Sequence, residues 1–217
     1  MNLMAKLILL RHFLSQWNKE NKFSGWTDVP LSTEGMAAAP AQTAKLPLAP
    51  DVVFTSPLSR NKTTTWLVLD QLGKQSVFLR PGEEPADRDD VPVYVTETLN
   101  ERSYGLLEGV NKDEAKRDYG EEQVHLWRRS WEVAPPEGES LEDVYQRIVP
   151  FFQDYAEPRL KAGQNVMMVG SHNSLRALVK YVEKISNEDI AQYVIPFGGI
   201  IVYDLDEDLA VTKKEVK

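Results

Sequence analysis

Short apolar runs alternate along the chain with longer segments whose apolar positions follow a helical period. Runs rich in Val, Ile, Met or Tyr, bounded by turn residues, predict strands at residues 5–10, 51–55, 91–96, 165–170 and 199–205. The helical pattern predicts helices at residues 59–72, 112–119, 121–131, 140–160 and 174–184. This alternation predicts an α/β fold, a three-layer α/β/α sandwich with a mainly parallel sheet.

Two prolines and one acidic loop interrupt this pattern. Pro40 lies within a helical pattern at residues 34–45, and Pro150 lies within residues 140–160. Proline lacks an amide hydrogen and collides with the preceding turn, so each of these helices should kink or divide. Residues 81–90 form an acidic loop, most simply a solvated insertion without chemistry. A loop that covers a site or meets a second subunit stays open as an alternative.

Size and charge narrow the class of protein. The 217 residues suffice for one sizeable core, so residues 1–217 are expected to form a single domain. Lys and Arg number 25 against 33 Asp and Glu, and the net charge of -8 disfavours a nucleic-acid partner and requires any basic pocket to be local. The chain has no cysteine, no signal-peptide pattern and no apolar run approaching the ~20 residues of a membrane span. We therefore expect a cytoplasmic protein without a membrane partner.

Chemically active residues follow the first two predicted strands. Arg11 and His12 end the first strand, and Arg60 begins the helix after the second. Open α/β folds bind ligands at the carboxyl edge of the sheet, and helix amino termini favour anions. The pattern predicts an anion site with a candidate nucleophile beside it.

A carboxylate and more cations lie in the middle of the chain. Glu101 is followed by Arg102 and Lys112, and the next helix carries Arg128 and Arg129. One carboxylate among several cations is typical of a phosphate-ester site, because Arg binds phosphate oxygens and Glu can move a proton. Taken singly, each residue has a plainer interpretation, such as a solvated helix face or a surface ion pair of little worth.

Taken together, these motifs resemble the histidine phosphatase superfamily and, within it, the cofactor-dependent phosphoglycerate mutases. The resemblance spans nearly the whole chain. It rests on residues 11–18 and 24–26, 55–60, 99–105 with 111–112, 119–122 with 127–130, and 173–181. The Asn-Glu-Arg-x-Tyr-Gly and Trp-Arg-Arg segments indicate the mutase branch, because simpler phosphatases of the superfamily lack them.

The resemblance implies a mechanism that needs no metal. His12 would attack phosphorus and become a phosphohistidine, with Arg11 and Arg60 neutralising the phosphoryl oxygens. Glu101 would be the general acid and base. 2,3-Bisphosphoglycerate would prime the histidine, and the substrates would be 3- and 2-phosphoglycerate, in glycolysis and gluconeogenesis. By the same resemblance, the residues that bind substrate or shape its loop are Ser15, Asn18, Ser24, Gly25, Arg102, Tyr104, Lys112, Arg128, Arg129 and Asn173.

The chain departs from the family pattern beside both histidine motifs. Aligned without a gap, Ser171 takes the position of the family's second catalytic histidine, and His172 takes that of the following glycine. Phe13 and Leu14 stand where the family has a glycine and an acid. Phe is tolerated there only if φ stays negative and the ring points away from the phosphate. Two outcomes are open for His172: it turns toward the phosphate and compensates for Ser171, or it points away as a capping or core histidine.

Three functional classes therefore remain. A mutase is favoured, because a phosphohydrolase for small phosphate esters does not need Lys112 with Arg128 and Arg129. The third class is a catalytically impaired protein that only binds a phosphorylated ligand. The remaining histidine, His125, lies in a charged helix and is expected to be solvated. Trp and Tyr are numerous enough to furnish a homodimer interface, but the oligomeric state stays open.

Overall fold

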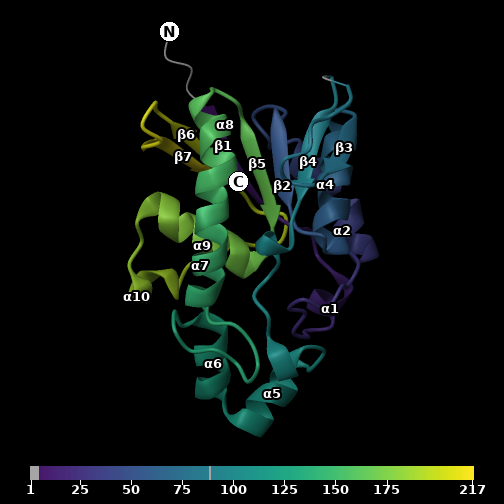
Figure 1. Ribbon diagram of the computed structural model, residues 1–217. Coiled ribbons are helices and arrows are strands. Elements are labelled where there is room, and N and C mark those ends of the chain that lie inside the picture. Colours follow the sequence, from purple (N-terminus) through teal and green to yellow (C-terminus); the bar gives the residue numbers. More distant parts are fainter. Residues whose placement is uncertain (1–4, 88) are drawn as a thin grey trace.

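The computed structural model describes residues 5–87 and 89–217 and is built on a seven-stranded sheet (Figure 1). Its strand order is β3-β4-β2-β5-β1-β6-β7. The first five of these strands run parallel, whereas β6 pairs antiparallel with β1 and β7 antiparallel with β6. The strands are β1 (Ala5–Arg11), β2 (Val52–Thr55), β3 (Ser76–Leu79), β4 (Val91–Val95), β5 (Val166–Gly170), β6 (Ile200–Leu205) and β7 (Val211–Val216). The predicted mainly parallel sheet is confirmed.

Helices cover both faces of the sheet (Figure 1). Successive residues of a strand point to opposite faces, so Leu7 and Leu9 of β1 enter a different apolar cluster from Ile8 and Leu10. The first cluster packs under α7, α8 and α9, and the second under α3 and α4. The helices are α1 (Gln16–Lys19), α2 (Thr33–Ala37), α3 (Ala39–Thr43), α4 (Ser59–Gln71), α5 (Lys112–Tyr119), α6 (Glu121–Arg129), α7 (Leu141–Phe151), α8 (Glu157–Lys161), α9 (His172–Glu183) and α10 (Asn187–Ile190). The three-layer prediction is confirmed.

The five predicted strands are all present, each differing from its predicted bounds by one residue at one end. The two strands that sequence reasoning missed, β3 and β7, lie at the edges of the sheet. β3 has only four residues. β7 carries Lys213, Lys214 and Glu215 and is largely exposed, as is common where charge protects a sheet edge from pairing. The apolar run of β3 is only three residues long, Val77 to Leu79, and β7 has none.

The two prolines act differently. The helical pattern around Pro40 divides into α2 and α3 as predicted, with the break at Ala38. Pro150 does not divide its helix, because it lies inside α7. The interruption comes directly after α7, as the π-helical turn η3 (Phe152–Ala156), and Pro158 lies in the first turn of α8. Proline fits a first helical turn because its missing amide hydrogen would have no partner there.

Helices α5 and α6 lie beyond the carboxyl ends of the parallel strands (Figure 1). They pack through a third apolar cluster in which Phe23 and Leu107 meet Ala115, Val124 and Trp127. The helix pair thus faces the edge at which the sequence predicts the site. The acidic loop joins two parallel strands, so it runs from the carboxyl end of β3 back to the amino end of β4, and none of its described residues lines the cavity found at that edge.

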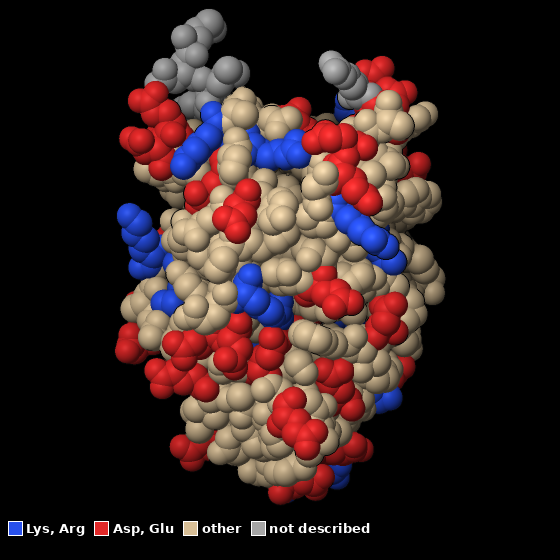
Figure 2. All heavy atoms as spheres, in the orientation of Figure 1, with Lys and Arg blue, Asp and Glu red and all other residues tan. Residues whose placement is uncertain are grey.

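Charge is unevenly distributed over the surface. Figure 2 shows acidic side chains gathered over the region that α5, α6 and α10 occupy in Figure 1. His125 of α6 is exposed, as predicted. No helix among residues 5–87 and 89–217 is long and apolar enough to cross a membrane.

Leu9→Ala tests the central strand. Leu9 is 0% exposed, and its loss should lower the free energy of unfolding by about 2–5 kcal/mol, because a cavity forms in a packed core. Urea denaturation followed by circular dichroism measures the change. Leu106→Ala is the matched control, because Leu106 is 62% exposed, and it should change stability little. Equal effects of the two substitutions would contradict the assignment of β1 to the core.

Candidate active site

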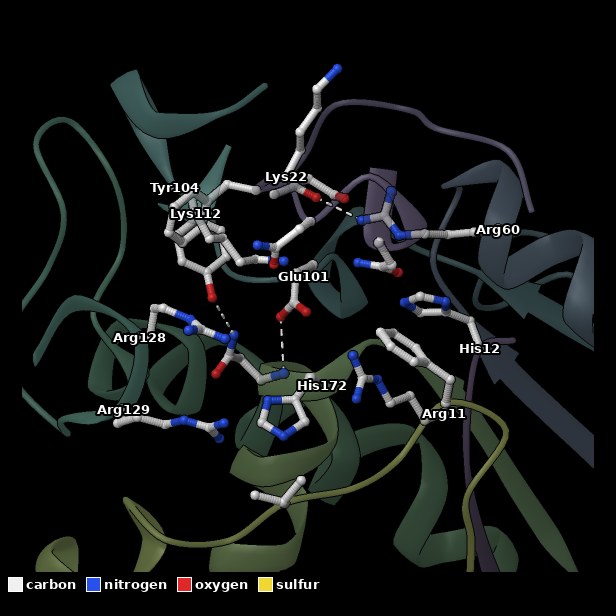
Figure 3. Close-up of a pocket in the computed structure, with 18 residues that line it drawn as sticks. Arg11, His12, Lys22, Arg60, Glu101, Tyr104, Lys112, Arg128, Arg129 and His172 are labelled. Carbon is white, nitrogen blue, oxygen red and sulfur yellow. Dashed lines mark hydrogen bonds between the residues drawn. The ribbon is translucent and has the colours of Figure 1, made fainter. Parts of the chain in front are cut away.

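The candidate site is a cavity of about 290 Å³ at the carboxyl ends of β1, β2 and β5. Figure 3 shows Glu101 between two groups of residues: His12 with its two arginines on one side, Tyr104 with the remaining cations on the other. The cavity therefore joins motifs that are far apart in the sequence. Of the predicted site residues, those that line it are Arg11, His12, Asn18, Ser24, Gly25, Arg60, Glu101, Tyr104, Lys112, Arg128, Arg129, His172 and Asn173.

His12 is a buried, neutral imidazole, with 3% of its surface exposed. Its Nδ1 lies 2.6 Å from the carbonyl oxygen of Phe13. Because that oxygen can only accept, Nδ1 carries the hydrogen and Nε2 keeps its lone pair. Burial, with Arg60 and Arg11 nearby, holds the pKa of His12 well below its usual range. The ring is thus suited to nucleophilic attack at neutral pH.

The two arginines beside His12 are held by carbonyl oxygens. The Arg60 guanidinium donates hydrogen bonds to Gly25 O at 2.7 Å and Thr27 O at 3.0 Å. Arg11 Nη1 donates to Ile195 O, and its Nε is buried without a partner among the described residues. Burial lowers the pKa of Arg11 to about 10, so it stays charged at neutral pH. A carbonyl oxygen orients a guanidinium without cancelling its charge, which stays available for an anion.

Glu101 is fixed through one of its two carboxylate oxygens. Its Oε1 accepts hydrogen bonds from the backbone N–H groups of Arg102 at 2.8 Å and Asn173 at 2.9 Å. The side chain is nearly buried, with 8% of the residue exposed. Both bonds use Oε1, so within the described part of the chain Oε2 is left for a ligand. This arrangement fits a general acid and base.

An ion pair holds the loop that carries Glu101. Arg147 Nε lies 2.8 Å from Glu139 Oε1, and both side chains are 20% exposed. The same guanidinium donates to the carbonyl oxygens of Asn100 at 3.0 Å and Glu101 at 3.1 Å. Glu139 Oε2 accepts from Ser103 N at 2.8 Å. Arg147 and Glu139 thus hold the backbone on both sides of the candidate acid and base.

A second group of cations lies across the cavity from His12 (Figure 3). Lys112 is the first residue of α5, and Arg128 and Arg129 end α6. Burial and the neighbouring Arg128 lower the pKa of Lys112 to about 8. Tyr104 OH lies between them and α9, where it accepts a hydrogen bond from Asn173 Nδ2 at 3.3 Å. The cavity thus offers anion-binding groups at two ends. Among the described residues, no cluster of His, Cys, Asp or Glu could hold a metal ion.

The side chains of Ser171 and His172, at the start of α9, have different surroundings. Ser171 caps the helix and is 0% exposed. Its Oγ lies 3.4 Å from Asn61 Nδ2, and it does not line the cavity, because its side chain turns into the buried contact between α9 and α4. His172 does line the cavity, and Figure 3 shows its ring between Arg11 and Arg129. A core or capping position for His172 is therefore excluded. Its contact with a transferring phosphoryl group stays a prediction.

Two other predicted residues lie behind the cavity lining. Ser15 caps α1, where its Oγ accepts from Asn18 N and donates to Asn18 Oδ1 at 2.7 Å. Ser15 therefore shapes the loop of a lining residue. Arg102 is 0% exposed and its Nη2 donates to Tyr104 OH at 3.0 Å. Tyr104 lines the cavity and Arg102 does not, so Arg102 supports a contact residue.

Phe13 and Leu14 are also outside the cavity lining. Phe13 is 1% exposed and packs in the apolar cluster under α3 and α4, with its φ outside the positive region. Both conditions that the sequence sets for Phe13 are met. The carbonyl of Leu14 accepts from Ser32 N at 2.9 Å, which joins this loop to the start of α2. The two bulky residues thus leave the side of His12 that faces the cavity open.

Sequence reasoning missed five residues of the lining: Asn21, Lys22, Phe23, Val194 and Phe197. The first three lie between the predicted Asn18 and Ser24, so their place in the sequence was a usable signal. Val194 and Phe197 come from the segment before β6, which carries no motif. Only the pairing of β6 with β1 brings that segment to the site.

The chain matches the family model of the histidine phosphatase superfamily (branch 1) over residues 7–215. It is 41% identical over 213 residues to a 2,3-bisphosphoglycerate-dependent phosphoglycerate mutase of Parvibaculum lavamentivorans, covering 97% of this chain and 95% of that protein. It is 40% identical over 239 residues to a protein of the same name from Staphylococcus aureus strain JH9, covering 97% and 99%.

Solved structures show the same fold at lower identity. A mycobacterial glucosyl-3-phosphoglycerate phosphatase in complex with VO3 has a TM-score of 0.77 at 19% identity, covering 98% of this chain and 97% of that chain. Bacillus stearothermophilus YhfR has a TM-score of 0.76 at 23% identity, covering 96% of each. At these identities, the likeness concerns the fold alone.

The lowered pKa of Lys112 predicts a pH dependence of ligand binding. Lys112 loses its proton in the free protein above about pH 8, and an anion favours the charged form. With 3-phosphoglycerate as the anionic probe, any affinity that the cavity has for it should therefore fall as pH rises from 8 to 9.5, by up to about tenfold per unit. Isothermal titration calorimetry measures it. Lys112→Gln should weaken binding at pH 7 and flatten the profile.

Lys116→Gln is the control for this profile. Lys116 lies on the same helix and pairs with Asp113 at 3.2 Å, outside the cavity lining. The alkaline fall should persist in this variant. An unchanged profile in Lys112→Gln would contradict the role of Lys112.

The ion pair behind Glu101 should be energetically coupled. In a double-mutant cycle of Arg147→Met and Glu139→Gln, urea denaturation should give a coupling energy of about 1–3 kcal/mol, because the pair and its carbonyl contacts are mostly buried. The exposed pair Arg117 and Glu114, 4.0 Å apart, serves as the control cycle and should show no measurable coupling. Equal coupling in the two cycles would contradict a positioning role.

Proposed function

The chain belongs to the histidine phosphatase superfamily (branch 1), and on that premise we propose that it interconverts 3-phosphoglycerate and 2-phosphoglycerate through a phosphohistidine at His12. The observation that carries the proposal is the second group of cations, Lys112, Arg128 and Arg129, across the cavity from His12. A phosphatase for a simple phosphate ester needs only one anion site. The relatives at about 40% identity, matched over 95% and 99% of their length and named phosphoglycerate mutases, support this choice.

The charge of the cavity supports a ligand with several anionic groups. Apart from Glu101, its ionised lining is cationic: Arg11, Lys22, Arg60, Lys112, Arg128 and Arg129. Like charges gathered out of water are unfavourable unless an anion joins them. Arg11 Nε, Arg129 Nη1 and Ser24 Oγ are buried without partners among the described residues, which suits a ligand that supplies acceptor oxygens. These groups would hold 2,3-bisphosphoglycerate, which when bound supplies the first phosphoryl group.

In the proposed reaction, the lone pair of His12 Nε2 attacks phosphorus. Arg11 and Arg60 stabilise the charge on the phosphoryl oxygens while the bond from phosphorus to the leaving oxygen breaks. Glu101 Oε2 gives its proton to that oxygen, which leaves as a hydroxyl group. In the return step, the oxygen of the other hydroxyl attacks the phosphorus of the phosphohistidine, and Glu101 takes the proton of that hydroxyl. The neutral state of His12 and the free Glu101 Oε2 support these roles.

The cations opposite His12 would hold the rest of the ligand during transfer. Lys112, Arg128 and Arg129 are placed to bind its carboxylate and second phosphate. Asn173 and Tyr104 would contribute neutral hydrogen bonds from the same side. His172 would bind the phosphoryl group in place of the imidazole that Ser171 does not provide. Small movements of the retained ligand would then present either hydroxyl to the phosphohistidine.

The alternative function is a phosphohydrolase for a related ester. The same His12, Arg11, Arg60 and Glu101 would serve it, with water as the final acceptor. Solved proteins of this fold include phosphatases by name. The second cation group favours the mutase. An inactive binding protein is less well supported, because the nucleophile, its arginines and the carboxylate all line one cavity.

The proposal predicts labelling of His12. Incubation with 2,3-bisphosphoglycerate carrying radioactive phosphate should give an acid-labile protein phosphate, and a coupled assay should detect isomerisation of 3-phosphoglycerate. His12→Asn should abolish both signals. Glu101→Gln should reduce turnover by about 10²-fold or more, because proton transfer is lost. Label with release of inorganic phosphate but no isomerisation would favour the hydrolase. No label in folded protein would contradict both.

A further inference from the structure

The segment before β6 contacts both Arg11 and His12. Gly198 N donates hydrogen bonds to Arg11 O at 3.2 Å and His12 O at 3.3 Å, and Arg11 N donates to Gly199 O at 3.0 Å. The side chain of Arg11 donates to Ile195 O in the same segment. Residues 195–199 therefore hold the backbone of the catalytic pair and the guanidinium of one member. The proposed reaction assigns no role to these residues.

Phe197 supplies the most specific of these contacts. Its ring centroid lies 3.8 Å from Arg11 Cζ and 5.9 Å from the centroid of the His12 ring. The residue is 37% exposed and lines the cavity. A guanidinium on an aromatic face is attracted by about 0.5–2 kcal/mol, with the larger values where water is excluded.

The buried Phe13 packs against this segment from the side of the apolar cluster under α3 and α4. Gly198 has a φ of 68°, and a methyl group on its Cα would lie 3.1 Å from Phe13 Cδ1. Phe13 itself is 1% exposed. The backbone beside Phe197 therefore rests on the Phe13 ring, in a conformation that other residues seldom adopt. The bulky residue after His12 thus has a structural function.

An aromatic partner suits Arg11 better than a carboxylate would. Among the described residues, Arg11 forms no ion pair, and its Nε has no partner. A carboxylate on Arg11 would restrain it but would also neutralise it and compete with a phosphate. The face of a ring restrains the guanidinium and leaves its edge and its charge free.

We propose that Phe197 is a positioning residue that holds the guanidinium of Arg11 in the orientation in which it binds the phosphoryl group. The inference rests on the proposed function in one respect, that His12 accepts a phosphoryl group. Phe197 acts through Arg11, so its removal should matter only while Arg11 has a planar guanidinium to stack. Lys in place of Arg11 keeps the charge but loses that plane.

The test is a double-mutant cycle that does not require phosphoryl transfer. Orthovanadate, which adopts the geometry of phosphorus during transfer, is titrated calorimetrically at pH 7.5 into wild type, Phe197→Leu, Arg11→Lys and the double variant. Phe197→Leu should weaken binding by about 3–10-fold in the wild-type background. It should weaken binding by less than twofold in the Arg11→Lys background. Equal losses in both backgrounds, or no loss in either, would overturn the proposal.

Two further variants separate positioning from general damage. Phe197→Tyr keeps the ring and should restore binding to within twofold of wild type. Phe78→Leu makes the same change at a ring that is 42% exposed on β3, outside the cavity lining, and should leave vanadate binding unchanged. Failure of Phe197→Tyr to restore binding would overturn the proposal, because the plane of the ring is its basis.

Labelling with radioactive 2,3-bisphosphoglycerate then separates this inference from the proposed function. Phe197→Leu should lower the rate of His12 labelling by a factor similar to the loss in vanadate affinity. A labelled wild type with equally fast Phe197→Leu would overturn the role of Phe197 alone. An unlabelled wild type whose vanadate cycle is nevertheless coupled would overturn the proposed function and leave the Arg11 contact supported.

Discussion

Positive charge gathered out of water is the constraint on which this site depends. Buried cations are costly without anions, yet carboxylate partners would cancel the charge that a phosphate ligand needs. The protein resolves this with carbonyl dipoles: Arg60 is held by Gly25 and Thr27, and Arg176 donates to the carbonyl oxygens of Arg129 at 3.1 Å and Ile190. A backbone carbonyl orients a guanidinium only if its loop is held in place. The loops at this edge must therefore be fixed by contacts of their own.

Glu108 shows how such a loop is fixed. Its carboxylate accepts from the backbone N–H groups of Trp26 at 3.0 Å, Thr27 at 2.9 Å and Tyr104 at 3.1 Å. It thereby joins the loop that orients Arg60 to the loop after Glu101. A methyl group on Gly25, where φ is 50°, would lie 1.9 Å from Glu108 Oε1, so this contact requires glycine. Glu108 thus serves backbone amides and forms no ion pair with the Arg60 guanidinium that this loop orients.

How far the sequence predicts the molecule depends on how local each signal is. The buried strands are found because Leu7 to Leu10 and their counterparts are continuous apolar runs, which the central strands of a covered sheet require. The edge strand β7 lacks such a run, because three consecutive charged residues, Lys213, Lys214 and Glu215, occupy its centre and most of the strand is exposed. Pro150 itself lies inside α7, and the predicted helix at residues 140–160 divides only after Phe151, at the π-helical turn η3.

In the site too, residues with a local sequence signal are predicted and residues without one are missed. Motif residues such as His12, Arg60 and Glu101 lie in one cavity, because parallel strands and short connections bring the strand ends to one edge. The place of Phe197 in the cavity could not be predicted in this way, because Phe197 belongs to no motif. It reaches the cavity because β6 runs antiparallel to β1, with Ile200 opposite Leu10, so the chain that enters β6 must pass the end of β1 where Arg11 and His12 lie. Any sequence with this topology places a segment there. In this chain, the large Phe13 beneath Gly198 makes the side chain and backbone of that segment part of the catalytic arrangement.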